Sequence, residues 1–480
     1  MPLVFGGANC WISNCDDLRT MSRIETHRPK VPWTWVSSMV LPWGALTYFG
    51  ACSGAPLTFT IRKLVESPTL VAFLSSINYA LVFLVSAVAS YMSDRIWTRW
   101  GRRRPFLVVG WIGGALAMFF VPLADNVWTL AALIVVFQLC SDIGSPYEPL
   151  YNEVIPPAQR GRASTMRNIL QNLTSLFFNG FMLAQFDRQY DLGKTSAWLH
   201  LNGEKAIYWV GTVLVLAAAL FLALGVRETP PPESIVRERF SFVRFVRDVF
   251  GQRQQWLVYL LYVCPWLMIA GIGTFGSSPT GAFVTLFQSE QLGFSKQQIG
   301  WAAGTIGVIN MLLFVPLWGY LADRVPRLGF FRWALLVPMV VNFTFFLLVR
   351  YVTDYSVPFS VLMAFSILSE GFMSLVYVLW GPLIYDYLPS NGYGTAGAGF
   401  SFVGGLTTFL LINGAGMWVQ GFTHLFGTLG KSPYDYSSAF IWQAACALLA
   451  FGIASYFARE VRRGKIIAYA KLEFEAAHKG

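Results

Sequence analysis

Charged residues are scarce in this sequence, in which Asp, Glu, Lys and Arg together make up only 12% of 480 residues. A soluble domain usually carries about 25% charged residues. Hydrophobic residues reach 55% and gather in long uninterrupted runs. The scarcity of charge therefore excludes an ordinary soluble protein and indicates an all-α chain that crosses a membrane many times.

Side chains that hold metals or act as catalytic bases are also few. The six cysteines lack the spacing of metal ligands, and four of them lie in apolar segments, where cysteine behaves as a small buried side chain. We expect no metal site, no cofactor and no enzymatic activity, because no nucleophile–base or metal constellation falls inside the membrane. The four histidines all fall in termini or expected loops, at His27, His200, His424 and His478.

Twelve segments reach the roughly 20 mostly apolar residues that a membrane-spanning helix needs. The first six are expected near Trp35–Phe59, Thr69–Ser93, Pro105–Leu123, Val127–Tyr151, Ala163–Phe186 and Ile207–Val226. The second six are expected near Trp256–Leu286, Ile299–Ala322, Gly329–Val349, Pro358–Leu388, Thr395–Gly421 and Ser437–Phe457. The chain thus divides into an N-terminal segment (1–32), a six-helix bundle (33–226), a linker (227–255), a second six-helix bundle (256–458) and a tail (459–480).

The distribution of Lys and Arg predicts the orientation of these helices. An even number of helices puts both termini on one side, and the segments on that side hold 27 basic residues against 8 in the opposite loops. Positively charged loops stay in the cytoplasm, so we expect both termini inside a plasma (inner) membrane. The first 20 residues resemble neither a secretory signal nor a membrane helix. The net charge of +10 follows from this bias, and no nucleic-acid partner is expected.

Two cationic loops reveal an internal duplication. Residues 94–105 read D-R-I-W-T-R-W-G-R-R-R-P, and a weaker copy, D-R-V-P-R-L-G-F-F-R, begins 229 residues later at Asp323. Leu173-Thr174 and Asn179-Gly180 likewise recur at Leu406-Thr407 and Asn413-Gly414. Offsets of 229 to 234 indicate a parallel repeat of six helices, which is a common construction of transporters.

Three carboxylates fall well inside expected helices, namely Asp142, Glu148 and Glu370. A charge at bilayer depth costs at least about 2.5–3.5 kcal/mol on insertion scales, so such acids are seldom incidental. We predict that they couple transport to protons or contact the substrate. The alternative is that each acid is permanently hydrogen-bonded and holds two helices together.

A polar stripe on the fifth expected helix carries amides at helical spacing. Amides that faced lipid would lack hydrogen-bond partners, so the stripe faces either protein, as helix–helix bonds, or a water-filled path. Aromatic side chains suit the apolar face of a sugar ring, and amides suit its hydroxyl groups. The predicted substrate-binding residues are Asn78, Gln138, Tyr147, Asn168, Gln171, Asn172, Ser175, Tyr377 and Trp380.

Basic residues are absent from the middle of the expected helices, and Arg167 lies only near the start of one. A site for organic anions normally needs a cation. The substrate is therefore expected to be neutral or cationic.

Acidic and basic residues at the cytoplasmic helix ends are predicted to form a gate. Asp94 and Asp323 close two helices beside the cationic loops, and Glu153 and Asp386 end two others on the same side. We predict that these acids pair with arginines of the loops and latch the cytoplasmic side, with Arg99, Arg104 and Arg332 as the candidates. The alternative is that the loops determine topology alone.

These loops resemble the G-x-x-x-D-R-x-G-R-R signature of the major facilitator superfamily, over roughly residues 33–460. Gly319 stands four residues before Asp323, whereas the first copy has Ser90 at that place. The longer first copy resembles the glycoside–pentoside–hexuronide and sucrose-transporter branch. So do P-Y-E-P-L at residues 146–150 and P-P-A-Q-R-G-R-A at residues 156–163.

The resemblance implies cation-coupled uptake of sugars by rocking of two six-helix bundles. Asp142-Ile143 matches the position of a cation-site aspartate on the fourth helix of melibiose-permease-like members. Those members also place aspartates on the second helix, where this chain offers only Asn78. Protons rather than sodium are therefore the expected coupling ion.

The sequence thus predicts a monomeric, proton-coupled importer of a sugar or glycoside that works by alternating access. Within the same class, an uncoupled carrier or an exporter of neutral or cationic compounds is the alternative. A transporter-like membrane sensor is the alternative from another class, although the 22 residues after the last expected helix are too few for a signalling domain.

Overall fold

The computed structural model describes residues 32–86, 89, 98–101, 103–155, 157–190, 201–226, 246–247, 249–269, 282–322, 324–388, 393–428, 432–466 and 468–469. Within these ranges, side chains are not described at 83–84, 148–149, 152–153, 157–158, 160–161, 385 and 393–395. Asp94 and Asp323 therefore lie outside the described residues, and so do the side chains of Glu148 and Glu153.

The first half of the chain forms an N-terminal bundle of six helical passes. Its elements are α2 (Trp33–Cys52) with α3 (Ala55–Leu64), α4 (Pro68–Leu81) with the π-helical η1 (Val82–Ser86), α6 (Arg104–Phe120) with η2 (Val121–Leu123), α7 (Val127–Ile143) with α8 (Tyr147–Val154), α9 (Pro157–Phe177) with η3 (Phe178–Met182) and η4 (Leu183–Gln185), and α10 (Gly203–Gly225).

The second half repeats this arrangement as a C-terminal bundle. Its elements are α12 (Arg253–Ile269), α13 (Ala282–Leu286) with η6 (Phe287–Gln291), α14 (Lys296–Ile309) with η7 (Asn310–Phe314) and α15 (Val315–Ala322), α16 (Arg327–Ala334) with α17 (Leu336–Leu347) and η8 (Leu348–Val352), α18 (Phe359–Tyr385), α19 (Tyr393–Phe426), and η10 (Tyr436–Ser438) with α20 (Ala439–Arg462).

The expected fold of twelve membrane-spanning helices is confirmed, although residues 270–281 of the seventh expected helix lie outside the described residues. Seven helices among the described residues are individually long and apolar enough to cross a membrane. Several passes are interrupted rather than continuous. The first is broken at Ser53 and Gly54, and the fourth at residues 144–146, immediately after Asp142. Proline at position 146 explains the second break, because proline cannot continue the hydrogen bonds of the preceding turn.

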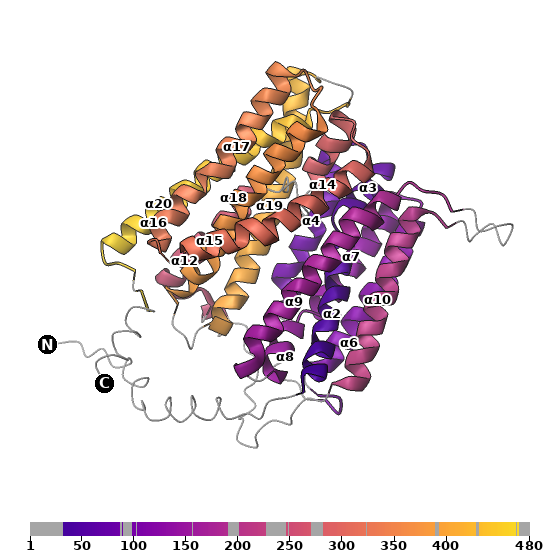
Figure 1. Ribbon diagram of the computed structural model, residues 1–480, viewed down its shortest axis with the longest axis vertical. Helices are drawn as coiled ribbons and strands as arrows, with labels where there is room; N and C mark the ends of the chain where they lie inside the picture. The colour runs from indigo at the N-terminus through magenta and orange to yellow at the C-terminus, as the bar shows by residue number, and fades with distance from the viewer. Residues whose placement is uncertain are drawn as a thin grey trace.

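The two bundles lean against each other at one end, as Figure 1 shows for the indigo-to-magenta and orange-to-yellow halves. We call the end where α10 stops at Gly225 and α12 starts at Arg253 the linker side, and the other end the far side. Helix α4 packs on α19, and the end of the α9 pass packs on α14. A Cβ added to Gly416 would lie 2.5 Å from that of Ala72, and one added to Gly300 would lie 2.1 Å from the Asn179 carbonyl oxygen, so glycine permits both crossings.

The buried apolar side chains show the same asymmetry. One cluster runs from the N-terminal bundle into the far half of the C-terminal bundle, through residues such as Phe283, Phe345 and Phe440. A second cluster of described residues, around Val258, Leu379 and Ala450, lies in the C-terminal bundle and includes Val249 and Ile466, which flank it. Among the described residues, the bundles therefore share a core on the far side and have separate cores on the linker side.

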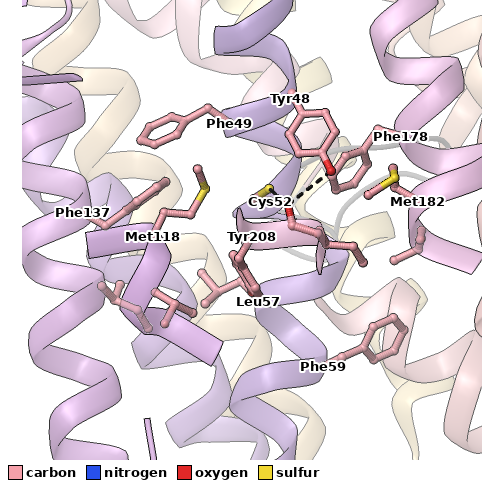
Figure 2. Close-up of a cluster of buried hydrophobic side chains, with 14 of the residues drawn as sticks. Tyr48, Phe49, Cys52, Leu57, Phe59, Met118, Phe137, Phe178, Met182 and Tyr208 are labelled. Carbon is pink, nitrogen blue, oxygen red and sulfur yellow. Dashed lines mark hydrogen bonds between the residues drawn. The ribbon is translucent and has the colours of Figure 1, made fainter. Parts of the chain in front are cut away.

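Part of the shared core surrounds the break in the first pass (Figure 2). The ring of Tyr48 packs edge-on against Phe178 at 4.9 Å, and the Tyr48 hydroxyl donates a hydrogen bond to the Ile207 carbonyl at 3.2 Å. Phe49 stacks on Phe137 with 4.4 Å between ring centroids. These contacts tie the first pass to the fourth, fifth and sixth within one bundle.

Candidate functional site

Asp142 is a buried carboxyl group at the last turn of α7, with only 6% of its surface exposed. The Gln138 amide, one turn earlier, donates a hydrogen bond to Asp142 Oδ1 at 3.0 Å. The second carboxyl oxygen, Oδ2, is buried and has no hydrogen-bond partner among the described atoms. Gln138 is thus placed as the partner of Asp142 rather than as a free substrate contact.

The helix face that carries Asp142 points away from α6. Cys140 and Gly144 contact Gly110 of α6. Asp142 is two positions after Cys140, so its side chain lies about 200° around the helix from that contact. The break after Ile143 also leaves Asp142 at a helix end, where Trp111 donates to the Gly144 carbonyl at 3.3 Å. Asp142 therefore lies on the side of α7 remote from α6.

Tyr147 braces the N-terminal bundle internally. Its hydroxyl donates to the Met39 carbonyl of α2 at 2.6 Å, and only 1% of the side chain is exposed. Its ring packs against Trp43 and Trp111, with centroids 5.2 and 5.1 Å away. The side chain predicted to bind substrate is therefore already fully engaged, by α2 and by its aromatic neighbours.

The amide stripe of α9 faces the seam with the C-terminal bundle. At its far end Asn179 is buried where the chain meets Gly300 of α14, while Asn168 and Asn172 nearer the linker side are exposed. At about 100° per residue, Asn168, Asn172, Ser175 and Asn179 fall within about 60° of one another, while the exposed Ile169 and Leu173 fall on another side.

The hydrogen bonds of this stripe leave polar capacity unused. Asn172 donates to the Asn168 carbonyl at 2.7 Å, and Asn179 donates to the Ser175 carbonyl at 3.0 Å. Gln171 and Ser175 are half-buried. Asn172 keeps a side-chain oxygen and a second N–H for other partners, whereas the Asn179 amide also donates to the Ser175 hydroxyl at 3.5 Å and keeps its oxygen. The stripe is therefore compatible with contact to a hydroxyl-rich solute.

Helix α18 contributes an aromatic group that faces the N-terminal bundle. Tyr377 is 38% exposed although it lies in the middle of an apolar helix, and its ring lies 6.2 Å from that of Trp380. Trp380 packs on Tyr262 of α12 at 4.9 Å and donates its indole N–H to the Tyr262 carbonyl at 3.2 Å. Tyr262 stacks in turn on Phe400 of α19 at 4.3 Å.

Glu370 shares the face of Tyr377, since seven residues make nearly two helical turns. The Glu370 carboxyl, Tyr262 and Tyr79 of α4 all lie within electrostatic reach of the Tyr377 hydroxyl. Tyr79 continues the face of α4 on which Ala72 and Ser76 meet α19. This group, Tyr79, Tyr262, Glu370, Tyr377 and Trp380, is defined here as the central aromatic group, and it draws from both bundles.

Two further residues bear on this group. The indole N–H of Trp266 on α12 is buried beside Gly404 of α19 and has no hydrogen-bond partner among the described atoms. Asn78 is half-buried on α4, but on a different side of the helix from Ser76 and Tyr79. Sequence reasoning missed Tyr79 and Tyr262. The face of α4 through Ala72 and Ser76 was an available signal for Tyr79, but it does not extend to Tyr262 on α12.

The predicted cytoplasmic gate is visible in part. Arg104 donates to the carbonyls of Leu222 and Ala223 at the end of α10. Asp386 pairs with Arg327, with Nη1 3.3 Å from Oδ2, so its partner stands five residues before the predicted Arg332. Arg99 is exposed in a turn of the first cationic loop. Neither observed contact joins the two bundles: that of Arg104 lies inside the N-terminal bundle, and that of Asp386 lies inside the C-terminal bundle.

Two bundles of six helices, related as repeats and meeting around buried polar groups, define a polytopic membrane transporter. The sequence matches the Major Facilitator Superfamily over residues 34–410. The chain therefore belongs to this superfamily, as the cationic loops had indicated.

Similar proteins agree with this assignment. Anhydromuropeptide permeases of Escherichia coli K12 and O157:H7 are 27% identical over 309 residues, which cover 61% of this chain and 57% of each permease. The matched part thus spans little more than half the length of these curated relatives.

Solved structures show the same fold at low identity. A bacterial homologue of the lysosomal transporter Spinster, in an inward-facing and unoccupied conformation, has a TM-score of 0.64 at 15% identity, covering 88% of this chain and 95% of its own. A D-xylose-proton symporter has a TM-score of 0.58 at 17% identity, covering 87% and 97%.

Proposed function

We propose that this transporter is a proton-coupled symporter of a sugar or glycoside, and that Asp142 carries the coupling proton. The observation that carries this proposal is the buried Asp142 carboxyl, of which one oxygen is bonded to Gln138 and the other is without a partner among the described atoms. A carboxyl group can hold a proton on such a free oxygen and accepts hydrogen bonds once it is ionised.

The central aromatic group is proposed as the platform for the sugar. Tyr377 offers an exposed ring to the apolar face of a pyranose, and Glu370, two turns earlier on the same face of α18, would accept hydrogen bonds from the sugar hydroxyl groups. Tyr79 brings the N-terminal bundle to the same place. A substrate bound there would contact both bundles, which is what rocking of the two bundles around a fixed site requires.

The branch of the superfamily and the names of relatives point in the same direction. The longer cationic loop and the P-Y-E-P-L segment resemble the glycoside–pentoside–hexuronide branch. The curated relatives are permeases for anhydromuropeptide, and one structural neighbour couples D-xylose to protons. We therefore place anhydromuropeptides beside simple glycosides among the candidate substrates.

The orientation follows from charge. The linker side carries the basic excess of 27 to 8, so we place this side and both termini in the cytoplasm of the plasma membrane. In that orientation the described conformation is joined on the outer side and parted toward the cytoplasm.

Uptake into proteoliposomes tests the proposal. Labelled disaccharides, glycosides and anhydromuropeptides are each offered with and without an inward proton gradient. Accumulation of at least one of them that depends on the gradient supports proton-coupled symport. Efflux of cationic dyes, together with no gradient-dependent uptake from the panel, would instead support the exporter.

A further inference from the structure

Two hydrogen-bonding side chains on facing helices of the C-terminal bundle are buried and have open polar atoms. The Thr408 side chain on α19 is only 3% exposed, and its hydroxyl makes no hydrogen bond to a described atom. The same holds for the buried indole N–H of Trp266 on α12. A buried polar group without a hydrogen bond destabilises a fold, so two of them on neighbouring helices require an explanation.

Comparable side chains elsewhere in the chain are hydrogen-bonded. The hydroxyl of Thr212 on α10 donates to the backbone carbonyl one turn earlier at 3.0 Å, which is a usual way of satisfying a buried threonine in a helix. The indole of Trp209 donates to a backbone carbonyl of α6 at 3.1 Å. Thr408 and Trp266 make neither kind of bond within the described residues, so their polar atoms stay available for a ligand.

The two open groups lie at the end of a stack of side chains between α12 and α19. Tyr262 stacks on Phe400 with 4.3 Å between ring centroids, and Trp266 and Gly404 each follow one turn later. A Cβ added to Gly404 would lie 3.0 Å from the Tyr262 ring and 3.6 Å from Trp266 Nε1, so the two helices face each other here. Thr408 lies one further turn along the same side of α19.

This end of the stack is level with the part of α4 that belongs to the central aromatic group. Helices α4 and α19 run in opposite directions, and Asn413 donates to the Ser76 hydroxyl at 2.8 Å. Counting along both helices from this contact places Thr408 within about one turn of the level of Tyr79. Trp266 lies one turn beyond the α12 member of the group. The open groups therefore border the proposed sugar platform.

The chemistry of the two groups defines what they can hold. An indole N–H can only donate, and a threonine hydroxyl can donate or accept, so both can turn to one accepting oxygen. The described parts of α4, α12 and α19 carry no charged side chain at this level. An anionic group would lose its water there without gaining a counter-charge from these helices. The fitting occupant is a neutral oxygen, either a hydroxyl group or the carbonyl of an acetamido group.

We infer that Trp266 and Thr408 form a subsite for a neutral oxygen of the transported sugar, beside the ring held by the central aromatic group. The inference rests on the proposed sugar substrate and is independent of proton coupling. In the empty protein both groups are unsatisfied, and binding of the oxygen satisfies them together. A sugar without an oxygen at this place leaves both groups unsatisfied, so the pair determines specificity.

The stability of the substrate-free protein tests whether the Thr408 hydroxyl is open. Thr408→Val keeps the shape of the side chain and removes the hydroxyl. Because no described bond is lost, the Tm of the full chain in detergent should stay the same or rise. Thr212→Val is the matched control, since it removes a hydroxyl that is bonded to backbone carbonyls, and it should lower the Tm.

Titration calorimetry of the same preparation, without a proton gradient, tests binding. The probes are cellobiose and chitobiose, which share one linkage and carry a hydroxyl and an acetamido group, respectively, at the second carbon. Thr408→Val and Trp266→Phe should each raise the Kd of a probe that binds the parent by about fivefold, as expected for one lost hydrogen bond. Thr408→Ser, which keeps the hydroxyl, and Trp209→Phe, the control for the indole, should leave the Kd unchanged. A larger loss for chitobiose assigns the acetamido carbonyl as the occupant, whereas an equal or larger loss for cellobiose assigns a hydroxyl.

Three results would overturn the inference. The first is a fall of Tm in Thr408→Val as large as that in Thr212→Val, which would make the hydroxyl a structural bond. The second is an unchanged Kd in both Thr408→Val and Trp266→Phe, and the third is a parent protein that binds neither disaccharide. Failure of the symport proposal gives another pattern, in which the Kd losses remain but uptake does not depend on the proton gradient.

Discussion

Replacing Asp142 with asparagine removes a titratable group while keeping its main contact. The Gln138 amide now donates to Asp142 Oδ1 at 3.0 Å, and an asparagine oxygen in the same place accepts that bond equally well. A hydrogen bond of this type is worth about 1 kcal/mol, and it is not lost. The variant should therefore fold and insert normally, and any change in transport reflects the missing proton.

The size of the effect follows from the coupling. An inward gradient of one pH unit supplies about 1.36 kcal/mol per proton, enough for about tenfold accumulation at one proton per substrate. Asp142→Asn should equilibrate substrate without concentrating it. Exchange of internal for external substrate, which needs no net proton movement, should persist.

The assay is accumulation of labelled substrate in proteoliposomes at a fixed pH difference, with exchange measured on the same preparation. Asp125→Asn serves as the control, because it removes an exposed carboxyl far from Asp142. Accumulation by Asp142→Asn at the parent level would refute the reasoning and leave Asp142 a structural residue.

Three other changes separate binding from packing. Tyr377→Ala should raise KM for the sugar by about tenfold while Tyr377→Phe changes it little, since a stacking ring is worth about 0.5–1.5 kcal/mol and survives in Phe. Tyr147→Phe should cost about 1 kcal/mol of stability through the lost bond to Met39, seen as a lower Tm, with KM unchanged. Asp435→Ala should lower Tm further, because it leaves Arg350 partly buried and unpaired at a cost of about 3–5 kcal/mol.

The helices and their duplication were predictable because lipid imposes a simple rule on the backbone. Apolar runs of about 20 residues have no alternative to helix in a bilayer. The matching Asn179 and Asn413 were correctly placed in the repeat, and both lie at contacts between the bundles. What a repeat cannot supply is the packing angle that decides which side chains meet.

The site was harder to predict for the same reason. Tyr79 and Tyr262 lie in apolar helices that carry other aromatic residues, such as Phe73 and Tyr259, and no polar pattern distinguishes a binding platform from packing. Tyr147 shows the converse difficulty, since this equally plausible aromatic braces the bundle through its bond to Met39, and its role in substrate binding stays a prediction. Asp386 pairs with Arg327, the first residue of α16, instead of the predicted Arg332, and the sequence pattern did not show where this helix begins.

Proton movement on substrate addition tests the central claim most directly. Proteoliposomes without an imposed gradient are given substrate in a weakly buffered medium, and the external pH is recorded. Symport predicts a transient rise of external pH in the parent protein and none in Asp142→Asn. Substrate entry without a pH change in the parent, or an undiminished change in Asp142→Asn, would contradict the account.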